Sequence, residues 1–519
     1  MRSRLLALPL LFLLAPAVHA QAGYGATEFS NSGAPEAQEA FLRGLLMLHS
    51  FEYEDAREAF QDARRLDPDF AMAAWGEAMT HNHPIWQEQD RDTAIAALDP
   101  WWDDIQNGTA IDGITEREAD YLWTLGALYG EGTKEERDYA YADAMAALAA
   151  AYPDDLDAAA FYALSILGTA HQGRDFMTYM DAAAVAEEVF AANPEHPGAA
   201  HYLIHAYDDP VHAPLGLRPA RVYADVAPAA SHALHMPSHI YFALGMWDEG
   251  AAMNVRSYEA AKARTDARGE GLNGHGWHAL QWLLYAELQR GRADEAERLF
   301  HLATDLAADD DRRRDWVATW PATVLVETED WTGPLAHAFD TLPDRLGDAR
   351  HHYAAARVAL AHGDRAAAEA VAADLRRRLE ADDDPGARVT ALEVDALLAL
   401  DAGAGAEALD LLDEAVALED EQPLDFGPAS PAKPAHELLG EVLLDLGRPD
   451  EAWDHFEEAL ARYPRRARSL LGVARAAQAV GDAETARAVY ADLADLWHAA
   501  DADLPALTEV QEHTPLGAR

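Results

Sequence analysis

The chain contains no cysteine among its 519 residues. Disulfide bonds, thiolate metal ligands and cysteine nucleophiles are therefore excluded. Long apolar runs are scarce as well: the run Leu5–Leu14 is too short to cross a bilayer, which takes roughly 20 residues, and nothing later approaches that length. No segment shows sustained alternation of apolar β-branched and polar residues. The sequence therefore predicts an almost entirely α-helical protein.

Positively charged residues are also few. The chain carries 40 Lys and Arg residues against 91 Asp and Glu residues, which gives a formal net charge of −51. Such a chain repels phosphate backbones and anionic lipid, so nucleic acid and membrane insertion are excluded as binding modes. The acidity is consistent either with solubility alone or with attraction of metal ions and cationic partners.

The first twenty residues have the features of a secretory signal. Arg2 and Arg4 precede the apolar run, and Val18-His19-Ala20 provides small residues at the positions that a signal peptidase needs. We therefore expect an exported protein, periplasmic or secreted, whose mature chain begins near Gln21.

A repeated helical pattern covers most of the chain. From Glu451 the sequence reads EAWDHFEEALARYP, in which Ala452, Phe456, Ala459 and Pro464 follow a glycine turn. This spacing resembles the second helix of a tetratricopeptide repeat, where small residues let two helices approach closely. The pattern predicts an all-α, TPR-like α-solenoid, a right-handed superhelix of helix pairs with a concave groove. It recurs at Ala56, Phe60, Ala63 and Pro68, at Ala296, Phe300 and Ala303, and at Ala486, Tyr490 and Leu493.

Breaks in this pattern predict how the chain is divided. Residues 84–140 have no clear repeat spacing and are interpreted as an insertion, whereas the proline-rich residues 421–435 are interpreted as a loop. The predicted segments are a signal peptide (1–20), a flexible N-terminal segment (21–36), an N-terminal solenoid (37–345), middle repeats (346–420), the proline-rich loop (421–435), C-terminal repeats (436–500) and a tail (501–519).

Histidine is concentrated in one segment. Nine of the 23 histidines lie between His196 and His278. His201 and His205 are four residues apart and project from one helix face, and the repeat spacing places His235 and His239 on a groove-lining first helix. These four imidazoles are the predicted ligands of a transition metal, zinc or copper, with iron as a further option. Pro237 can start a helix there and leave His235 in the preceding turn.

Further polar residues are expected to line the groove or to orient the metal ligands. Two other interpretations of the histidines stay open: structural hydrogen bonds between repeats, and a groove that binds an anionic or peptide ligand through protonated imidazole. The additional candidates are Glu77, His81, His83, His171, Asp208, Asp209, His232, His275 and His278.

Three stretches together resemble a known group of proteins. They read HPGAAHYLIHAYDDP followed by GLRPARVYADVAPAASHALHMPSHIYFALGMWDE, GEAMTHNHPIW at Gly76–Trp86, and FYALSILG at Phe161–Gly168. Over roughly residues 40–265 the chain resembles exported, histidine-rich bacterial tetratricopeptide repeat proteins. The resemblance implies the repeat fold and the position of the site, and it implies no particular reaction.

The sequence favours a binding scaffold whose concave groove takes a protein or peptide partner and carries a transition-metal site. A metalloenzyme is the main alternative, in which the metal activates water or dioxygen and Glu77 or Asp208 acts as base. A factor that delivers metal or protein cargo is the third. No HExxH motif, nucleophile elbow or phosphate loop is present, so the sequence favours a scaffold over an enzyme.

Overall fold

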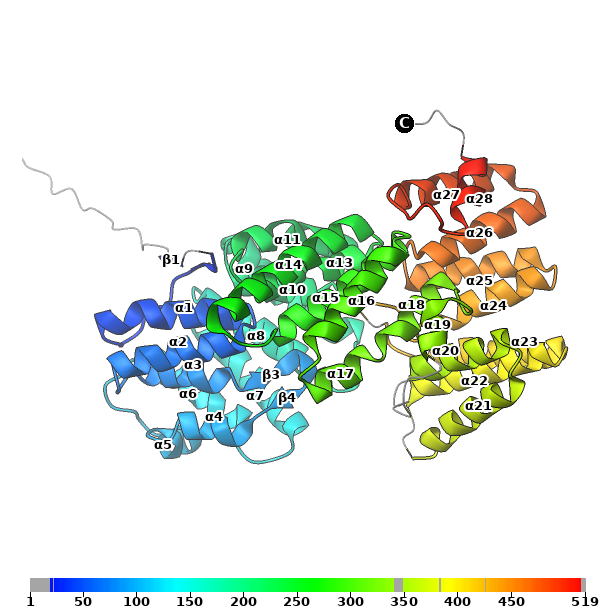
Figure 1. Ribbon diagram of the computed structural model, residues 1–519. Helices are drawn as coiled ribbons and strands as arrows, with labels where there is room; N and C mark the ends of the chain where they lie inside the picture. Colours follow the sequence, from blue (N-terminus) through cyan, green and yellow to red (C-terminus); the bar gives the residue numbers. More distant parts are fainter. Residues whose placement is uncertain (1–18, 22, 340–348, 382–383, 425, 515–519) are drawn as a thin grey trace, which may run out of the picture. The chain divides into compact units, whose positions relative to one another are not determined.

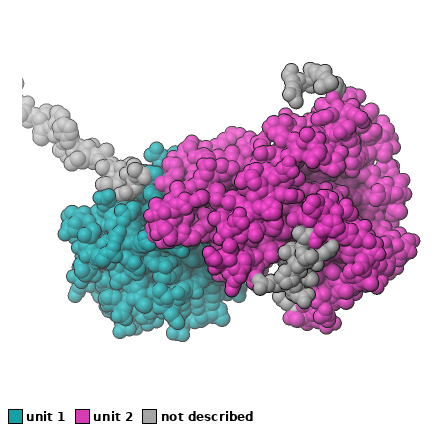
Figure 2. Space-filling model, in the orientation of Figure 1, with its two compact units in different colours: residues 1–165, 188–199 teal, residues 166–187, 200–519 magenta. Residues whose placement is uncertain are grey.

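The computed structural model describes residues 19–21, 23–339, 349–381, 384–424 and 426–514. The predicted signal peptide falls almost wholly, and the predicted C-terminal tail partly, outside these ranges. The chain divides into two compact units: unit 1 comprises residues 1–165 and 188–199, and unit 2 comprises residues 166–187 and 200–519 (Figure 2). Within the described residues, every helix is too short or too polar to serve as a membrane span.

The described residues are mostly helical, with two short antiparallel strand pairs. In β1–β2, His19 lies opposite Thr27, and in β3–β4, Asn82 lies opposite Gln89. The first elements are β1 (His19–Gln21), β2 (Gly25–Thr27), η1 (Pro35–Ala37), α1 (Gln38–His49), α2 (Tyr53–Leu66), α3 (Ala71–Met79), β3 (Asn82–His83), η2 (Pro84–Trp86), β4 (Glu88–Gln89), α4 (Arg91–Ala97), α5 (Trp102–Asn107), α6 (Glu116–Leu128), α7 (Lys134–Ala151), α8 (Leu156–Leu167) and α9 (Phe176–Ala192).

The remaining secondary-structure elements of the described chain are all helices. They are α10 (Pro197–Ala206), α11 (Ala213–Val226), α12 (Ser231–His235), α13 (Pro237–Ala243), α14 (Trp247–Arg268), α15 (Gly274–Gln289), α16 (Ala293–Leu306), α17 (Asp311–Val317), α18 (Trp320–Thr328), α19 (Pro334–Phe339), α20 (Ala349–Ala361), α21 (Arg365–Leu379), α22 (Pro385–Asp401), α23 (Gly405–Asp420), α24 (Ala435–Asp445), α25 (Pro449–Arg462), α26 (Ala467–Val480), α27 (Ala483–Leu496) and α28 (Leu507–His513).

The all-α, TPR-like fold is confirmed. From α20 to α27 each helix packs on the next one along the chain, and the pairs follow one another from yellow to red in Figure 1. The turns inside the pairs end in glycines with left-handed backbone, such as Gly291 (φ +71°) and Gly447 (φ +74°), a conformation that ends a helix with no steric cost for glycine. The small and aromatic residues of the repeat pattern are buried at Ala56, Phe60, Ala63, Ala296, Ala303, Ala452, Phe456, Ala459, Ala486, Tyr490 and Leu493.

The segment predicted to be flexible, residues 21–36, makes specific contacts, and its flexibility stays a prediction. Where it is described it is bound to unit 1 by hydrogen bonds: the hydroxyl of Thr27 donates to Asp157 at 2.7 Å, and the amide of Ser32 donates to Glu118 at 2.7 Å. Both acceptors are buried carboxylates that also have other partners, and the segment provides donors to the remaining oxygens, Oδ2 of Asp157 and Oε1 of Glu118. The boundaries of the other predicted segments stay predictions.

Phe456 illustrates how the repeats pack. Its ring is fully buried and lies against Gly440 on α24 and Gly472 on α26. A Cβ atom at Gly472 would lie only 2.4 Å from the ring. The glycine therefore lets two helices approach the same aromatic side chain.

Replacing Gly472 with alanine is expected to destabilise the protein by about 1–3 kcal/mol, because the enclosed Phe456 ring must move. Urea unfolding followed by circular dichroism measures the change. Gly405→Ala is the matched control, since the nearest atom to its added Cβ, on Leu446, lies at 3.8 Å. Equal stability of the two variants would contradict this packing.

Candidate metal centre

Seven histidine rings of unit 2 lie together, and four helices supply them. Helix α12 packs against α14 and α15, and α13 packs against α11 and α14. Five of the rings belong to residues that are at most 5% exposed, and the two on α15 belong to partly buried residues. They are His201 and His205 on α10, His232 and His235 on α12, His239 on α13, and His275 and His278 on α15.

The first three-histidine group comprises His201, His205 and His232, with one ring nitrogen from each within 4.8 Å of the others. The two rings on α10 are one helical turn apart, and their Nε2 atoms lie 3.1 Å from each other. The ring of His275 lies 4.7 Å from that of His232, at the edge of the group. Three imidazoles at this spacing can hold one transition-metal ion.

The second three-histidine group comprises His235, His239 and His278, and it meets the same distance limit. A break at Met236 separates α12 from α13, and Pro237 is the first residue of α13, as expected for a residue without an amide hydrogen. The break does not separate the rings, because the Nε2 atoms of His235 and His239 lie 3.0 Å apart.

Hydrogen bonds to the Nδ1 atoms of His235 and His239 fix which nitrogen of each ring carries the proton. Asn254 donates its amide to the carbonyl of Gly250 at 2.9 Å, so its oxygen faces His235 and accepts from Nδ1 at 2.7 Å. Asp208 accepts from Nδ1 of His239 at 2.5 Å. In the neutral rings the proton is therefore on Nδ1, and each Nε2 presents a lone pair.

Two lone pairs that face each other at 3.0 Å repel unless a cation lies between them. A single proton can bridge two nitrogens, whereas a metal ion can also use the third nitrogen, from His278. The acceptors on Nδ1 are the kind of outer partners that hold histidine ligands in place in metal sites.

The environment keeps four of these rings neutral. Burial, reinforced by the neighbouring histidines, holds the pKa values of His205, His232 and His235 well below the usual 6.5. Burial, with His239 and His275, lowers the pKa of His278 to about 3. Because only the neutral ring binds a metal, the cluster is ready to accept a cation at neutral pH.

The structure thus places the four predicted ligands in two groups rather than in one. His201 and His205 are completed by His232, and His235 and His239 are completed by His278. The rings of His205 and His239 are 5.9 Å apart, so the two groups are neighbours. Sequence spacing identified both pairs, whereas the third ring of each group comes from a helix distant along the chain.

The other predicted residues have different surroundings. Three carboxylates, Glu77, Asp208 and Asp209, were predicted to orient the rings, and of these Asp208 contacts His239. Asp209 instead binds Arg174 and His212, and His171 belongs to neither group. Three candidates lie in unit 1: Glu77, which accepts from Gln61 and Arg64, and His81 and His83, which line a separate cleft.

Two functional side chains were not predicted. Asn254 is the one amide among the buried residues of α14, most of which are small, and a signal of this kind can be found in the sequence. Trp282 lies one turn after His278, and its ring is 4.4 Å from His239. It forms an apolar wall of the second group, as a hydrophobic shell does in many metal sites.

A third cluster, in unit 1, has a similar composition and a different chemistry. His49, Asp157 and His196 are fully buried, and Oδ1 of Asp157 lies 2.9 Å from Nε2 of His49 and 3.3 Å from Nε2 of His196. The amide of Ala199 donates to Nδ1 of His196 at 3.2 Å, so the neutral ring carries its proton on Nε2, facing the carboxylate. Hydrogen bonds from His49 and Thr27 satisfy the carboxylate of Asp157, and Nε2 of His196 adds only the 3.3 Å contact, so the carboxylate needs no metal.

Replacing Asp157 with asparagine is expected to destabilise unit 1 by about 2–3 kcal/mol, because the amide group meets donors from His49, His196 and Thr27. Metal content is expected to be unchanged. Thermal unfolding and elemental analysis of the same sample measure both quantities, and loss of a bound ion would contradict the hydrogen-bonded interpretation.

The cluster of His49, Asp157 and His196 is also expected to make the wild-type protein less stable in acid. Burial lowers the pKa of His49 to about 4, whereas the unfolded chain binds that proton near pH 6.5. Burial alone would raise the pKa of Asp157, but the contacts with His196 and His49 outweigh it and hold the pKa below its usual range. The unfolding free energy should therefore fall by up to about 3 kcal/mol between pH 6.5 and 4. A flat profile over that range, measured by urea unfolding, would contradict this cause.

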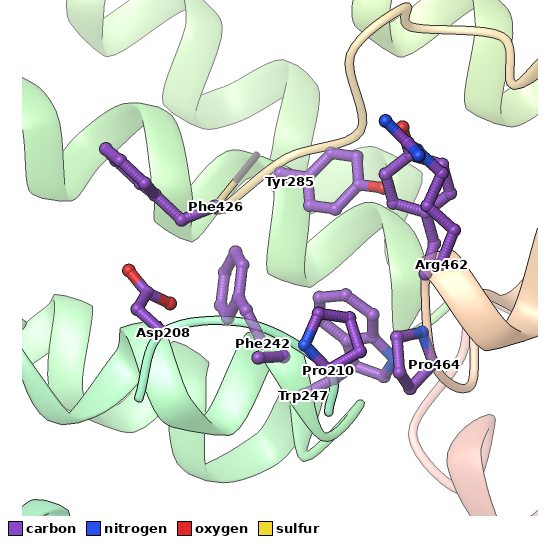
Figure 3. Close-up of a pocket in the computed structure, with 11 residues that line it drawn as sticks. Asp208, Pro210, Phe242, Trp247, Tyr285, Phe426, Arg462 and Pro464 are labelled. Atoms are coloured by element: carbon purple, nitrogen blue, oxygen red, sulfur yellow. The ribbon is translucent and has the colours of Figure 1, made fainter. Parts of the chain in front are cut away.

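A small cavity lies beside the second group (Figure 3). In this view Asp208 and Phe426 lie at one end and Arg462 and Pro464 at the other, with Phe242 between. Its volume is about 20 Å³, enough for one water molecule. The Oδ1 atom of Asp208 is buried and has no hydrogen-bond partner among the described residues. A water molecule in the cavity would provide one.

Comparison with known proteins does not assign a family. No family model matches the chain, and no curated protein matches it. Similar solved structures include yeast Tom70 (12% identity, 92% of this chain and 88% of that chain, TM-score 0.31) and the APC/C hetero-tetramer Cut9–Hcn1 (12%, 77% and 84%, 0.31). The human IFIT1 dimer with m7Gppp-AAAA is another (13%, 91% and 91%, 0.38). All three TM-scores are below 0.5, so these likenesses do not establish a family.

Proposed function

We propose that this chain is an exported helical-repeat scaffold that binds two transition-metal ions, one in each three-histidine group of unit 2. The facing Nε2 atoms of His235 and His239, 3.0 Å apart with both protons held on Nδ1, carry this proposal. The corresponding 3.1 Å contact between His201 and His205 supports a second ion. The net charge of −51 adds a general attraction for cations.

Zinc and copper fit the ligands best. Each group offers three neutral imidazoles, which suit zinc, copper and iron, and no thiolate or carboxylate ligand that would favour another ion. Burial favours resident ions over cargo, because ions delivered to a partner need an accessible site. The ions would join helices α10, α12, α13 and α15 and so stabilise this part of unit 2.

The repeats provide the second half of the proposed function. Tandem helix pairs present extended surfaces that suit a protein or peptide partner, and the acidic composition favours a basic one. We place this partner on the concave face of the repeats. Export rests on the basic and apolar pattern of residues 1–20.

A metalloenzyme is the second candidate. It is favoured by Oδ1 of Asp208, which has no hydrogen-bond partner in the described part of the chain. A carboxylate next to a metal-bound histidine and a water-sized cavity could accept a proton from water. The cavity of about 20 Å³ admits water but no organic substrate, however, which favours the scaffold.

Elemental analysis of the untagged protein, purified from its native compartment, tests the proposal. Two equivalents of zinc, copper or iron per chain are expected. A metal-free protein that also fails to bind these ions on titration would overturn it, since protons would then have to bridge the histidine pairs.

A further inference from the structure

Unit 1 contains a cleft that the proposed metal centre does not use. Its volume is about 480 Å³, within the range of pockets that hold small molecules. All its lining residues are polar or charged, unlike the apolar walls of most such pockets. They come from helix α2, from the β3–β4 hairpin with its flanking residues, and from the start of α4. The cleft therefore suits a small polar ligand.

One side of the cleft offers hydrogen-bond donors. Arg57 forms no ion pair with a carboxylate among the described residues, although the chain has more than twice as many acidic as basic side chains. Its Nε donates to the hydroxyl of Thr80 at 3.3 Å, which leaves the two terminal amino groups for a ligand. A guanidinium fork of this kind matches a carboxylate.

His81 stands beside Arg57. It is only 8% exposed, and its ring makes no hydrogen bond within the described part of the chain. Burial, then the charge of Arg57, lowers its pKa below 6.5. A largely buried polar ring that lines a cleft and has no partner among the described residues is an independent indication that a ligand completes the site.

The hairpin offers acceptors. Nε2 of His83 donates to the carbonyl of Thr80 at 3.2 Å, so the neutral ring has its lone pair on Nδ1. That atom lies 3.7 Å from Oε2 of Glu88, so two acceptors face each other across the strand pair. Tyr53 stacks on the ring at 4.1 Å and holds it in this orientation. An ammonium group between His83 and Glu88 would satisfy both.

We infer that this cleft binds a small zwitterion, an amino acid or short peptide, with its carboxylate on Arg57 and its ammonium group between His83 and Glu88. Overall charge supports a zwitterion over a simple anion, because a chain of net charge −51 repels anions but not a neutral dipole. The two carboxylate oxygens of Asp90 already accept from Thr93, so Asp90 leaves Arg57 available.

Calorimetric titration of the full-length, metal-loaded protein tests the inference. The probes are the common L-amino acids taken singly, then glycine, diglycine and triglycine, which separate the two charges by increasing distances. Acetate and methylamine carry one charge each. At least one zwitterion is expected to bind with one-to-one stoichiometry, about tenfold or more tighter than either single-charge probe. The best member of the glycine series distinguishes an amino acid from a peptide.

Variants show where the zwitterion binds. Arg57→Gln is expected to weaken binding by about tenfold or more, and Glu88→Gln by a smaller factor. Arg65→Gln is the matched control, since Arg65 is exposed and pairs with Asp62. The metal content of all three variants should equal that of the wild type, which separates this site from the metal centre. Saturation by no zwitterion below about 10 mM, equal binding of acetate, or unchanged binding by Arg57→Gln would each overturn the inference.

Discussion

Alanine at His201, His205 and His232 is expected to remove one of two bound metal ions and to leave the other in place. The reason is that each three-histidine group has its own nitrogens, within 4.8 Å of one another, and they share no ligand. The reciprocal variant, with alanine at His235, His239 and His278, should lose the other ion. Elemental analysis of both variants measures the stoichiometry.

Each loss is also expected to lower thermal stability. An ion that binds only the folded state stabilises it by about 4 kcal/mol when its free concentration is a thousand times the Kd. His301→Ala is the control, since His301 is exposed and belongs to neither group. Loss of both ions from either triple variant would contradict two separate sites, and loss of neither would contradict the assignment of the ligands.

Replacing Arg466 with methionine is expected to destabilise unit 2 by about 3–5 kcal/mol. Arg466 is fully buried, and its guanidinium donates to Glu437 at 2.8 Å, to Glu327 at 2.7 Å and to the hydroxyl of Tyr285 at 2.8 Å. The variant leaves two buried carboxylates without this cation. Chemical unfolding near pH 7 measures the difference.

The effect of Arg466→Met should depend on pH in a known direction. Burial raises the pKa of Glu327 in the wild type although Arg466 opposes it. Burial would also raise the pKa of Glu437, but the charges of Arg466 and Lys433 outweigh it and hold that pKa below its usual range. Without Arg466 both pKa values must rise. Protonation then removes the uncompensated charge. The difference in unfolding free energy between the wild type and the variant should therefore shrink as the pH falls toward about 5.

Arg298→Met removes an exposed ion pair with Glu295 and should lower the free energy of unfolding by less than about 1 kcal/mol. A stability difference that does not depend on pH would indicate lost packing rather than lost charge.

The fold could be predicted because its signal is local. Ala452, Phe456 and Ala459 occupy one face of α25, and their spacing is enough to identify a helix that packs closely in a repeat. The same holds for the His201–His205 pair, since residues four apart always share a helix face. These parts of the prediction needed no knowledge of which helices meet.

The rest depends on contacts between distant parts of the chain. His278 joins His235 and His239 only because α15 packs on α12, and Asn254 orients His235 from α14. The His49–Asp157–His196 cluster joins residues more than a hundred positions apart, so no spacing rule could find it. The contact of Thr27 in the N-terminal segment with the buried Asp157 is of the same kind, because the two residues lie 130 positions apart.

An anomalous diffraction measurement at the absorption edge of the bound metal tests the central claim most directly. Crystals of the untagged protein should show two peaks, one among His201, His205 and His232 and one among His235, His239 and His278, each about 2.0–2.1 Å from the ring nitrogens. A map without peaks between the facing Nε2 atoms, from protein crystallised with excess zinc or copper, would contradict the account and leave bridging protons as the explanation.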